Sequence, residues 1–342
     1  MNTFLELSTR AGVHFMGVNP GLQKPNIAFD YGVAMDAQPS LVTVSNSGIP
    51  AFLSTYIDPK LIDVLVSPMK AAEVVGGEVK KGDWTTQTAM FPVIESTGEV
   101  SSYGDYSENG RAGVNSNFPQ RQSYHYQVVT QWGEKELETA GLARIDWANR
   151  LNIASILTLN KFQNKTYFFG VAGLQNYGLL NDPNLSAAIV PTTKTAGGTL
   201  WSVATGTEVV ADITKLYVKL QSQANGTIDR DTAMTLAMSP LSDGNGLTKV
   251  TDFNVTVAQK IKAIYPNMKV VVAPEYSTTS GEVVQLIADE VEGQRTADTA
   301  FTEKLRAHPI VVQSSSFKQK KSQGTWGTII YRPAFIAQMI GV

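Results

Sequence analysis

The sequence predicts a mixed α/β fold (α+β), in which a compact α/β lobe is combined with segments that have no core of their own. Two observations predict the lobe and its support. Helical and strand patterns alternate between residues 186 and 313, and a long amphipathic helix precedes them at 134–163. A third observation predicts the extended segments. Residues 1–50 and 84–132 carry glycines, aromatic residues and short apolar groups, but too few apolar positions to form a core.

Residues 1–50 are predicted to form an N-terminal arm. They show no sustained helical or strand periodicity, and an unstructured stretch of this length is unusual inside a compact domain. The group Leu41-Val42-Thr43-Val44 is short and apolar, so it is able to add a strand to another element. Prolines and glycines interrupt the rest of the segment; they are Pro20, Pro25, Pro39, Pro50, Gly12, Gly17, Gly21, Gly32 and Gly48.

Residues 59–75 are predicted to be one or two short helices that end at Gly76 and Gly77. Residues 84–132 are predicted to form a long two-stranded loop. Its strands are expected at 84–94 and 123–132, separated by a polar, glycine-containing tip. In the second strand Tyr124, Tyr126, Val128, Thr130 and Trp132 share one face, which is the period-2 pattern of a strand. Because aromatic residues concentrate in the cores of protein interfaces, four are candidate subunit contacts; these are Trp84, Tyr124, Tyr126 and Trp132.

The clearest helix is predicted at 134–163. Its apolar residues recur with a period of about 3.6 from Leu137 to Phe162, with glutamates in the first turns and lysines at the far end, which complements the helix dipole. A glycine-rich segment follows at 170–183. Beyond it, helices are expected at 206–222 and 255–264, and strands at 232–237, 268–273, 283–290, 309–313 and 325–332, with a short helix at the C-terminus. The strand 269–273, which is apolar after Lys269, is expected at the centre of its sheet.

Composition excludes several classes of protein. Hydrophobic residues make up 43% of the 342 residues, which is enough for a core, while charged residues make up only 17%. With 28 basic and 30 acidic residues there is no basic excess of the kind that a nucleic-acid-binding protein carries. The absence of cysteine excludes disulfides and cysteine-based zinc sites. No secretory signal and no membrane-spanning apolar run is found, so the chain is expected to be soluble and cytoplasmic at synthesis.

One set of motifs favours an enzyme. Ser67-Pro-Met-Lys70, Ser107-Glu-Asn109 and Lys194-Thr-Ala-Gly197 follow the order of the serine β-lactamase and penicillin-binding motifs. Pro68 and Ala196 interrupt the pattern, so a helix, a loop tip and a turn are the simpler interpretation. The histidines His14, His125 and His308 are isolated in sequence and predict no metal cluster, and Asp243-Gly-Asn-Gly246 lacks the later ligands of a calcium loop. No catalytic, cofactor or metal site is predicted.

Charge is distributed unevenly, and this suggests a contact between copies. The predicted loop carries an acidic excess, and the densest basic cluster lies at 318–321. The simpler interpretation is two solvated loops. The alternative is that the acidic loop lies on a basic surface of a neighbouring subunit, either this cluster or the Lys161/Lys165 end of the long helix. The candidate contact residues are Glu99, Asp105, Glu108, Lys318, Lys320 and Lys321.

The order and lengths of these elements resemble the HK97-like fold of tailed-bacteriophage major capsid proteins and their encapsulin relatives. The resemblance rests on the helix 134–163 followed by GVAGLQNYGLLNDPNL, and on the closing segment GTWGTIIYRPAFIAQMIGV. It implies an arm at 1–50, an extended loop at 84–132 and a peripheral domain at 51–83 and 133–185 that contains a spine helix at 134–163. It also implies an axial domain at 186–313 and a return to the peripheral domain at 314–342.

The resemblance implies a structural protein without catalysis or cofactor. Its copies would form pentamers and hexamers of an icosahedral shell around double-stranded DNA, which they contact without sequence specificity. The implied location is the virion, after assembly in the host bacterial cytoplasm, with no membrane. Implied partners are the chain itself, a separate scaffolding protein, a portal and a decoration protein. An encapsulin-type protein compartment and a serine hydrolase of the penicillin-binding type are the alternatives.

The chain departs from parts of the family in two respects. Residues 1–50 lack the length and charge of the scaffolding domain that some members carry, which is why a separate scaffolding protein is expected. Other members crosslink their shells through a lysine of the extended loop, but this chain has no lysine between Lys81 and Lys135. Mature shells are therefore expected to dissociate into single subunits on a denaturing gel, without ladders.

Overall fold

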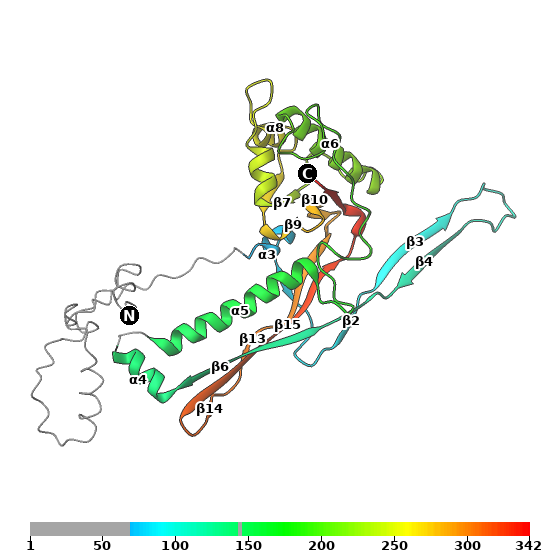
Figure 1. The fold of residues 1–342 in the computed structure, drawn as a ribbon. Coiled ribbons are helices and arrows are strands. Elements are labelled where there is room, and N and C mark those ends of the chain that lie inside the picture. The colour runs from blue at the N-terminus through cyan, green and yellow to red at the C-terminus, as the bar shows by residue number, and fades with distance from the viewer. Residues whose placement is uncertain (1–68, 143–145) are drawn as a thin grey trace, which may run out of the picture. The chain divides into compact units, whose positions relative to one another are not determined.

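The computed structural model describes residues 69–142 and 146–342, which belong to one compact unit spanning residues 64–342 (Figure 1). The expected arm at 1–50 lies outside the described residues, as do Ser67 and the first part of the expected helix at 59–75. The described remainder of that helix is α3 (Ala71–Val75), which ends at Gly76 with a φ of 90°. Gly76 thus ends the helix as predicted, because a left-handed conformation favours glycine.

The first sheet has five strands. β15 pairs with β13 and β14 along one edge and with β6 along the other, and β1 pairs with β13. β6 and the last long strand confirm the predicted strands at 123–132 and 325–332, although the latter begins earlier, at Ser316. All pairs are antiparallel except β1 with β13. The strands are β1 (Glu78–Lys80), β6 (Tyr124–Gly133), β13 (Ala297–Ala307), β14 (Val311–Val312) and β15 (Ser316–Ile330).

The predicted single helix at 134–163 is two helices, α4 (Glu134–Leu142) and α5 (Trp147–Phe169). Asp146 starts the second helix, because its side chain accepts a hydrogen bond from the backbone N–H of Asn149 at 3.3 Å. α5 also continues six residues beyond the predicted end. It packs on the first sheet, with Leu159 buried and Phe162 against aromatic residues of β6.

The second sheet forms the α/β lobe, in the order β16-β10-β7-β8 with β9 paired to β10. The predicted helices at 206–222 and 255–264 and the strands at 232–237 and 283–290 are confirmed within about two residues. The elements are α6 (Gly206–Gln223), β7 (Met234–Met238), α7 (Pro240–Ser242), η3 (Asp243–Leu247), α8 (Val257–Ile264), β8 (Met268–Val272), η4 (Pro274–Tyr276), β9 (Ser277–Thr278), β10 (Gly281–Ala288), β11 (Glu290–Val291), β12 (Gln294–Arg295), η5 (Pro333–Phe335) and β16 (Ile336–Ile340).

Both faces of the lobe sheet are buried. Leu236 and Leu286 pack on one side with apolar residues of α6 and α8, such as Ile213 and Ile261. Ala237 and its neighbours pack on the other side with α3 and with the C-terminal end of α5. Since both helices of the second group belong to segments that flank the first sheet, this second core joins the lobe to that sheet.

Two expectations about the lobe are wrong. The strand expected at 268–273 is β8, which lies at the edge of the sheet and not at its centre, with Val270 exposed. The short C-terminal helix is instead the strand β16, paired antiparallel to β10. Its side chains alternate between the two cores, Ile336 in one and Ala337 in the other. The need to fill both faces therefore decides the structure of a segment whose local pattern is ambiguous.

The chain passes between the two sheets more often than the sequence suggests. β13 and β14 fall within the expected axial segment 186–313, but they pair with β15 in the first sheet. Conversely, β16 falls within the expected return segment 314–342 and completes the lobe sheet. The two sheets are therefore each built from segments that are far apart in the sequence.

Candidate inter-subunit surfaces

The expected extended loop is a hairpin with a fixed root, but its strands are not the predicted ones. The expected second strand at 123–132 is β6, which pairs with β15 in the first sheet, and the hairpin shaft pairs residues 93–99 with 111–117. At the root, β2 (Thr88–Met90) pairs with β5 (Gln120–Gln122). The guanidinium of Arg121 donates a hydrogen bond to Asp182 Oδ2 at 2.6 Å, in a buried ion pair, and lies over the ring of Tyr177 at 4.7 Å. The backbone N–H of Gln122 donates to the carbonyl of Gln175 at 2.9 Å. The glycine-rich segment that follows α5 therefore holds the root of the hairpin.

Glycine is required where this segment turns back on α5. A Cβ atom on Gly178 would lie 2.3 Å from the carbonyl oxygen of Phe168, and one on Gly170 would lie 2.3 Å from that of Asn176. Gly170 also has a φ of 62°. The close approach lets the side-chain amide of Asn176 donate to the carbonyls of Gln122 and Thr325, at 3.0 and 3.1 Å. One side chain thus links the hairpin root to β15.

The shaft of the hairpin consists of β3 (Val93–Glu99) and β4 (Arg111–Asn117), and every residue of both strands is exposed. Their register gives the shaft two different faces. Glu95, Glu99 and Arg111 lie on one face, while Ile94 and Val114 lie on the other, where the remaining residues are small. No residue of the described chain covers either face. A two-stranded ribbon is at best marginally stable alone in water, so its order depends on a further contact.

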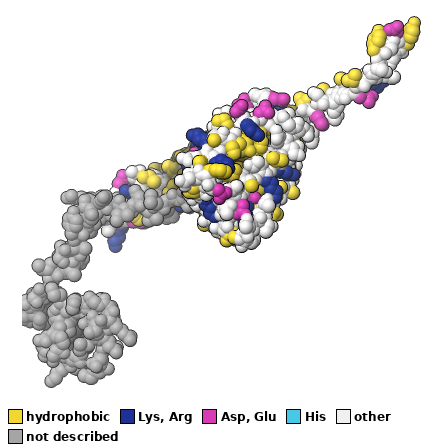
Figure 2. Space-filling model, turned by 90° about the horizontal axis from the view of Figure 1, so that it is seen from above, with side chains coloured by type: hydrophobic (Ala, Val, Ile, Leu, Met, Phe, Trp, Pro, Cys, Tyr) yellow, Lys and Arg dark blue, Asp and Glu magenta, His cyan; other side chains and the backbone are white. Residues whose placement is uncertain are grey.

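The tip of the hairpin, between β3 and β4, combines apolar and acidic side chains. Val100, Tyr103 and Tyr106 are almost completely exposed. Asp105 and Glu108, two of the predicted acidic contact residues, are exposed beside them. Figure 2 shows the two kinds of side chain next to each other along the hairpin and at its tip. Large aromatic side chains left in water are typical of a surface that another protein covers.

The four predicted aromatic contacts pack mainly within their own subunit. The rings of Tyr124 and Tyr126 lie 6.2 and 4.6 Å from that of Phe162 on α5, and the hydroxyl of Tyr126 donates to Gln323 at 2.7 Å. Burial raises the pKa of Tyr126 well above its ordinary value, with a smaller contribution from the charge of Glu78. These contacts fix β6 on α5.

The remaining two aromatic residues also have partners in the chain. Trp132 is buried and stacks with Phe317 across the strand pair β6–β15, at 6.1 Å. Trp84 is half-buried; its ring meets His125 edge-on at 4.5 Å, and the guanidinium of Arg306 lies 5.3 Å above it. Burial lowers the pKa of His125 below its ordinary value.

The predicted basic cluster is divided between the two faces of the first sheet. Lys318 and Lys320 are exposed on β15, opposite Gln131 and Val129 of β6, which are exposed on the same face. Within residues 69–142 and 146–342, neither lysine forms an ion pair with a carboxylate. The two ammonium groups are therefore available to a partner with acidic side chains.

Lys321 points to the opposite face, toward α5, and is buried. Its ammonium group donates to the side-chain oxygen of Asn152 and to Ser155 Oγ, both at 2.7 Å. Burial lowers its pKa below the ordinary value of a lysine, since these neutral oxygens replace water without supplying a negative charge. Lys321 thus belongs to the packing of α5 on β15, and the exposed basic surface consists of Lys318 and Lys320.

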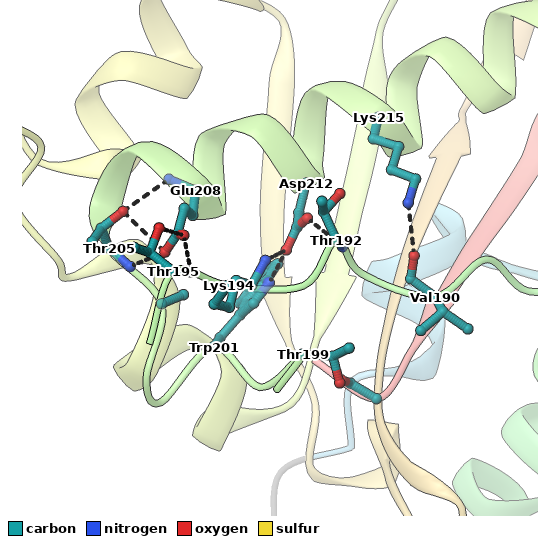
Figure 3. A network of polar contacts seen from close by, with 12 residues as sticks. Val190, Thr192, Lys194, Thr195, Thr199, Trp201, Thr205, Glu208, Asp212 and Lys215 are labelled. Carbon is teal, nitrogen blue, oxygen red and sulfur yellow. Dashed lines mark hydrogen bonds and ion pairs between the residues drawn. The ribbon is translucent and has the colours of Figure 1, made fainter. Parts of the chain in front are cut away.

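The lysine of the third enzyme-like motif, Lys194, lies in a structural network of the lobe (Figure 3). Lys194 forms a buried ion pair with Asp212 of α6. Asp212 also accepts hydrogen bonds from the indole N–H of Trp201 at 2.9 Å and from the backbone N–H of Thr192 at 3.1 Å. These contacts fasten residues 192–201 to α6. Lys70, the lysine that the motif would need to activate its serine, forms an ion pair with Glu73.

The same network includes the start of α6. Thr205 and Glu208 form a capping box, in which each side chain accepts a hydrogen bond from the other residue's backbone N–H. Backbone N–H groups of Thr205 and Thr195 both donate to Glu208 and lower its pKa to about 2. Ser107, the serine of the second enzyme-like motif, lies at the exposed hairpin tip.

The other sequence motifs have structural roles. Asp243-Gly-Asn-Gly246 forms most of the π-helix η3, where Gly246 packs against the ring of Trp201. His14 lies outside the described residues, and His308 contacts Ser322 Oγ at 2.9 Å. Among the residues that the structure describes, no group of three or more His, Cys, Asp or Glu is arranged to hold a metal ion. None of the described helices has the length and apolar character needed to cross a lipid bilayer.

Sequence reasoning missed the residues that position the surface. Arg121 lies within a loop with an acidic excess, and its partner Asp182 lies 61 residues away, so no local pattern indicates the pair. Phe162 was assigned to the apolar face of a helix, without its contact to β6. Val311 and Val312 lie within the strand expected at 309–313, but their exposure on the short edge strand β14 was not predicted.

Comparison with protein families gives one assignment for most of the chain. The model of the family described as Pa193 gp26 major capsid protein matches residues 40–341. No curated protein sequence is similar to the chain.

Comparison with solved structures gives the fold. The capsid of Myoviridae phage XM1 aligns with a TM-score of 0.73 at 12% identity, covering 87% of this chain and 100% of that one. The capsid of a native GTA particle aligns with a TM-score of 0.58 at 10% identity, covering 88% and 98%. The capsid of cyanophage P-SCSP1u aligns with a TM-score of 0.53 at 9% identity, covering 90% and 98%. The predicted HK97-like fold is thereby confirmed.

Proposed function

The chain belongs to the Pa193 gp26 major capsid protein family, and we propose that the acidic hairpin of each copy lies on the basic surface of a neighbouring copy in the shell. As a major capsid protein it is a structural component of a virion. The family assignment supports neither the encapsulin-type compartment nor the serine hydrolase. In the proposal, Glu99, Asp105 and Glu108 face Lys318 and Lys320 of the neighbour.

The observation that carries this contact is the complete exposure of the hairpin shaft and tip. Residues that pack on nothing in their own subunit need another partner to become ordered, and the shell supplies copies of the same chain. The charge of the hairpin indicates a basic partner surface. Arg121 of the hairpin root is already paired with Asp182, so Arg111 alone offsets the glutamates and aspartates of the exposed part. An isolated surface ion pair contributes little, but a shell repeats each contact in every subunit.

The two sheets correspond to two domains in this proposal. The first sheet with α5 forms a peripheral domain, whose spine helix is α5, and the lobe with α6 and α8 forms an axial domain that lies around the symmetry axes of pentamers and hexamers. The shell is icosahedral and surrounds double-stranded DNA. Residues 1–50 act as an arm between copies. Trp84, Tyr124, Tyr126 and Trp132 act at the contact indirectly, because they hold β6 and the hairpin root in place.

Further partners follow from the proposed role. We propose a separate scaffolding protein, a portal and a decoration protein, with assembly in the host bacterial cytoplasm. Packaged DNA is contacted without sequence specificity and is held weakly. Basic and acidic residues are nearly balanced at 28 and 30, so the chain lacks the basic excess that strong binding to DNA needs. Expression of the chain with and without a candidate scaffolding protein, followed by electron microscopy, tests the first partner. Closed shells only with that protein support it, and equal shells without it contradict it.

Charge reversal tests the proposed contact. Lys318→Glu with Lys320→Glu should abolish shells, and Glu99→Lys with Asp105→Lys and Glu108→Lys should do the same. Each set is on exposed residues, so the free energy of unfolding of the subunit should change by less than about 0.5 kcal/mol. Combining both sets restores opposite charges and should restore shells, as seen by electron microscopy and size-exclusion chromatography.

The combined variant is the control for the proposal. Shells from either single set at wild-type yield would contradict the charge pairing. Failure of the combined variant while both single sets assemble would contradict it as well, since the pairing predicts that the single sets fail and the combined variant assembles.

A further inference from the structure

β6 has the longest free strand edge in the part of the chain that the structure describes. It is a 10-residue strand whose ladder partner is β15 alone, so the other edge of β6 pairs with no described strand. The other edge strands differ. β14 has two residues, β1 has three and carries Glu78 and Lys80, and β8 has five and carries Lys269. The edge of β16 is covered by Ile189, whose backbone N–H donates to the carbonyl of Gln338 and whose carbonyl accepts a hydrogen bond from the N–H of Ile340.

β6 also lacks the features with which proteins protect such edges. Natural edge strands carry lysine, other charges, proline or a bulge, which prevent another strand from pairing. Residues 124–133 contain no charged residue and no proline. Their register with β15 is continuous over ten residue pairs, whereas the pairing of β13 with β15 is interrupted by irregularities. A long, regular and uncharged edge is suited to accept a strand.

The hairpin also has strand edges without a partner among the described residues. β3 and β4 pair only with each other among the described residues, so each has a free edge, and a ribbon of two strands needs a third for stability. Each of its strands has seven residues, which span about 23 Å, and fit within the roughly 33 Å of β6. Adding the hairpin to β6 satisfies the backbone groups of both.

The side chains select β3 as the strand that meets β6. Lys318 and Lys320 lie one strand away from the free edge, on β15, with Val129 and Gln131 of β6 beside them on the same face. A strand added next to β6 lies about 9.6 Å from β15, a distance that extended glutamate and lysine side chains can bridge. β3 carries Glu95 and Glu99 on one face, while β4 carries Arg111.

The opposite faces match as well. With its acidic face on the side of the lysines, β3 presents Ile94 on the side of the sheet where α5 lies. There Phe162 of α5, which packs against Tyr126, is a partly exposed apolar residue. Pairing in this orientation therefore places charge next to charge and apolar side chains on the apolar side.

From these observations we infer that strand β3 of a second copy pairs with the free edge of β6, so that the hairpin extends the first sheet of its neighbour. The inference rests on the proposed contact between hairpin and basic surface, and adds to it a backbone pairing and a defined strand. Its occupant is a second copy of this chain.

Disulfide trapping tests the occupant, and the chain suits it because it contains no cysteine. Val129→Cys is combined in turn with Glu95→Cys, Thr97→Cys or Glu99→Cys, which all lie on the face that should meet Val129. Assembled shells are oxidised and run on a non-reducing denaturing gel. At least one pair should give ladders of linked subunits. The matched control is Val129→Cys with Ser96→Cys, on the opposite face of β3, which should give none.

Amide hydrogen exchange tests the pairing independently. In an antiparallel edge strand alternate N–H groups point away from the sheet, so about half of the β6 amides should exchange rapidly in dissociated subunits. In shells these amides should become protected by at least tenfold. Amides of α6, which are bonded within the helix, should change little and serve as the internal reference.

The outcomes separate the inference from the proposed function. Shells that form normally but give no ladder, with unchanged exchange in β6, overturn the strand pairing while the capsid role stands. Protection of β6 together with ladders from Val129→Cys and Val42→Cys overturns β3 as the occupant in favour of residues 41–44. Ladders from the Glu95, Thr97 or Glu99 variants together with protection of β6 support the inference.

Discussion

The lobe and the hairpin are opposite solutions to the stability of a β-sheet. In the lobe, β7 and β10 are covered on both faces by residues of the same chain, and Leu236 and Ala237 on adjacent positions fill two different cores. In the hairpin, β3 and β4 are exposed on both faces. The comparison shows that one subunit contains a sheet covered on both faces by its own chain and a ribbon whose stability is expected to come from neighbouring subunits.

The largest effect is expected from removal of the hairpin shaft and tip. Replacing residues 93–117 by a short glycine turn should abolish shells completely, because it removes the whole exposed contact. The free energy of unfolding of the subunit should change by less than about 0.5 kcal/mol, since no core residue is lost. Electron microscopy and urea unfolding measure the two effects. Normal shells from this variant would contradict the assignment of the hairpin to assembly.

A large effect on the subunit itself is expected at the hairpin root. Arg121→Met leaves the buried carboxylate of Asp182 without its cation and should lower the free energy of unfolding by about 3–5 kcal/mol. The double variant with Asp182→Asn removes the unpaired charge as well and should recover most of the loss. Urea unfolding of the variants gives these values, and additive losses in the double variant would show that the ion pair is not the cause.

A comparable test contrasts the two sheets directly. Leu236→Ala in the centre of β7 should lower the free energy of unfolding by about 2–5 kcal/mol, because it leaves a cavity in a closed core. Ile94→Ala on β3 removes a similar side chain from an exposed position, and should change the unfolding of the subunit by less than about 0.5 kcal/mol. Ile94→Ala should instead reduce the urea concentration at which shells dissociate. Equal effects of both substitutions on the free subunit would remove the distinction between the two regions.

The smallest effect is expected at Lys321, and it depends on pH. Burial lowers the pKa of its ammonium group in the folded subunit below the value of 10.5 for an exposed lysine. Between the two values the unfolded chain binds more protons, so the free energy of unfolding should rise as the pH increases through this window. Lys321→Met should abolish this rise. Lys320→Met keeps the buried lysine and should retain it, and the two curves are measured by urea unfolding between pH 7 and 10.

The sequence alone determined the elements whose patterns are long and regular. The alternation in Tyr124, Tyr126 and Trp132 predicted β6, and the helical patterns at 206–222 and 255–264 predicted α6 and α8, because each pattern reports one face that must be buried. The exposed, acidic hairpin was also predicted, from glycines and charges that exclude a core. The family resemblance at residues 170–185 and 324–342 predicted the HK97-like fold.

The tertiary structure decided what depends on contacts between distant segments. Whether the apolar strand β8 is central or at an edge, and whether residues 336–340 form a helix or a strand, depends on which faces the rest of the sheet leaves open. The separation of Lys321 from Lys318 and Lys320 depends on the register of β15 with β6 and on the position of α5. Local sequence carries no record of these partners, since burial is a property of the folded chain. The edge of β6 that pairs with no described strand is visible only once the strands of residues 69–342 that the structure describes are placed.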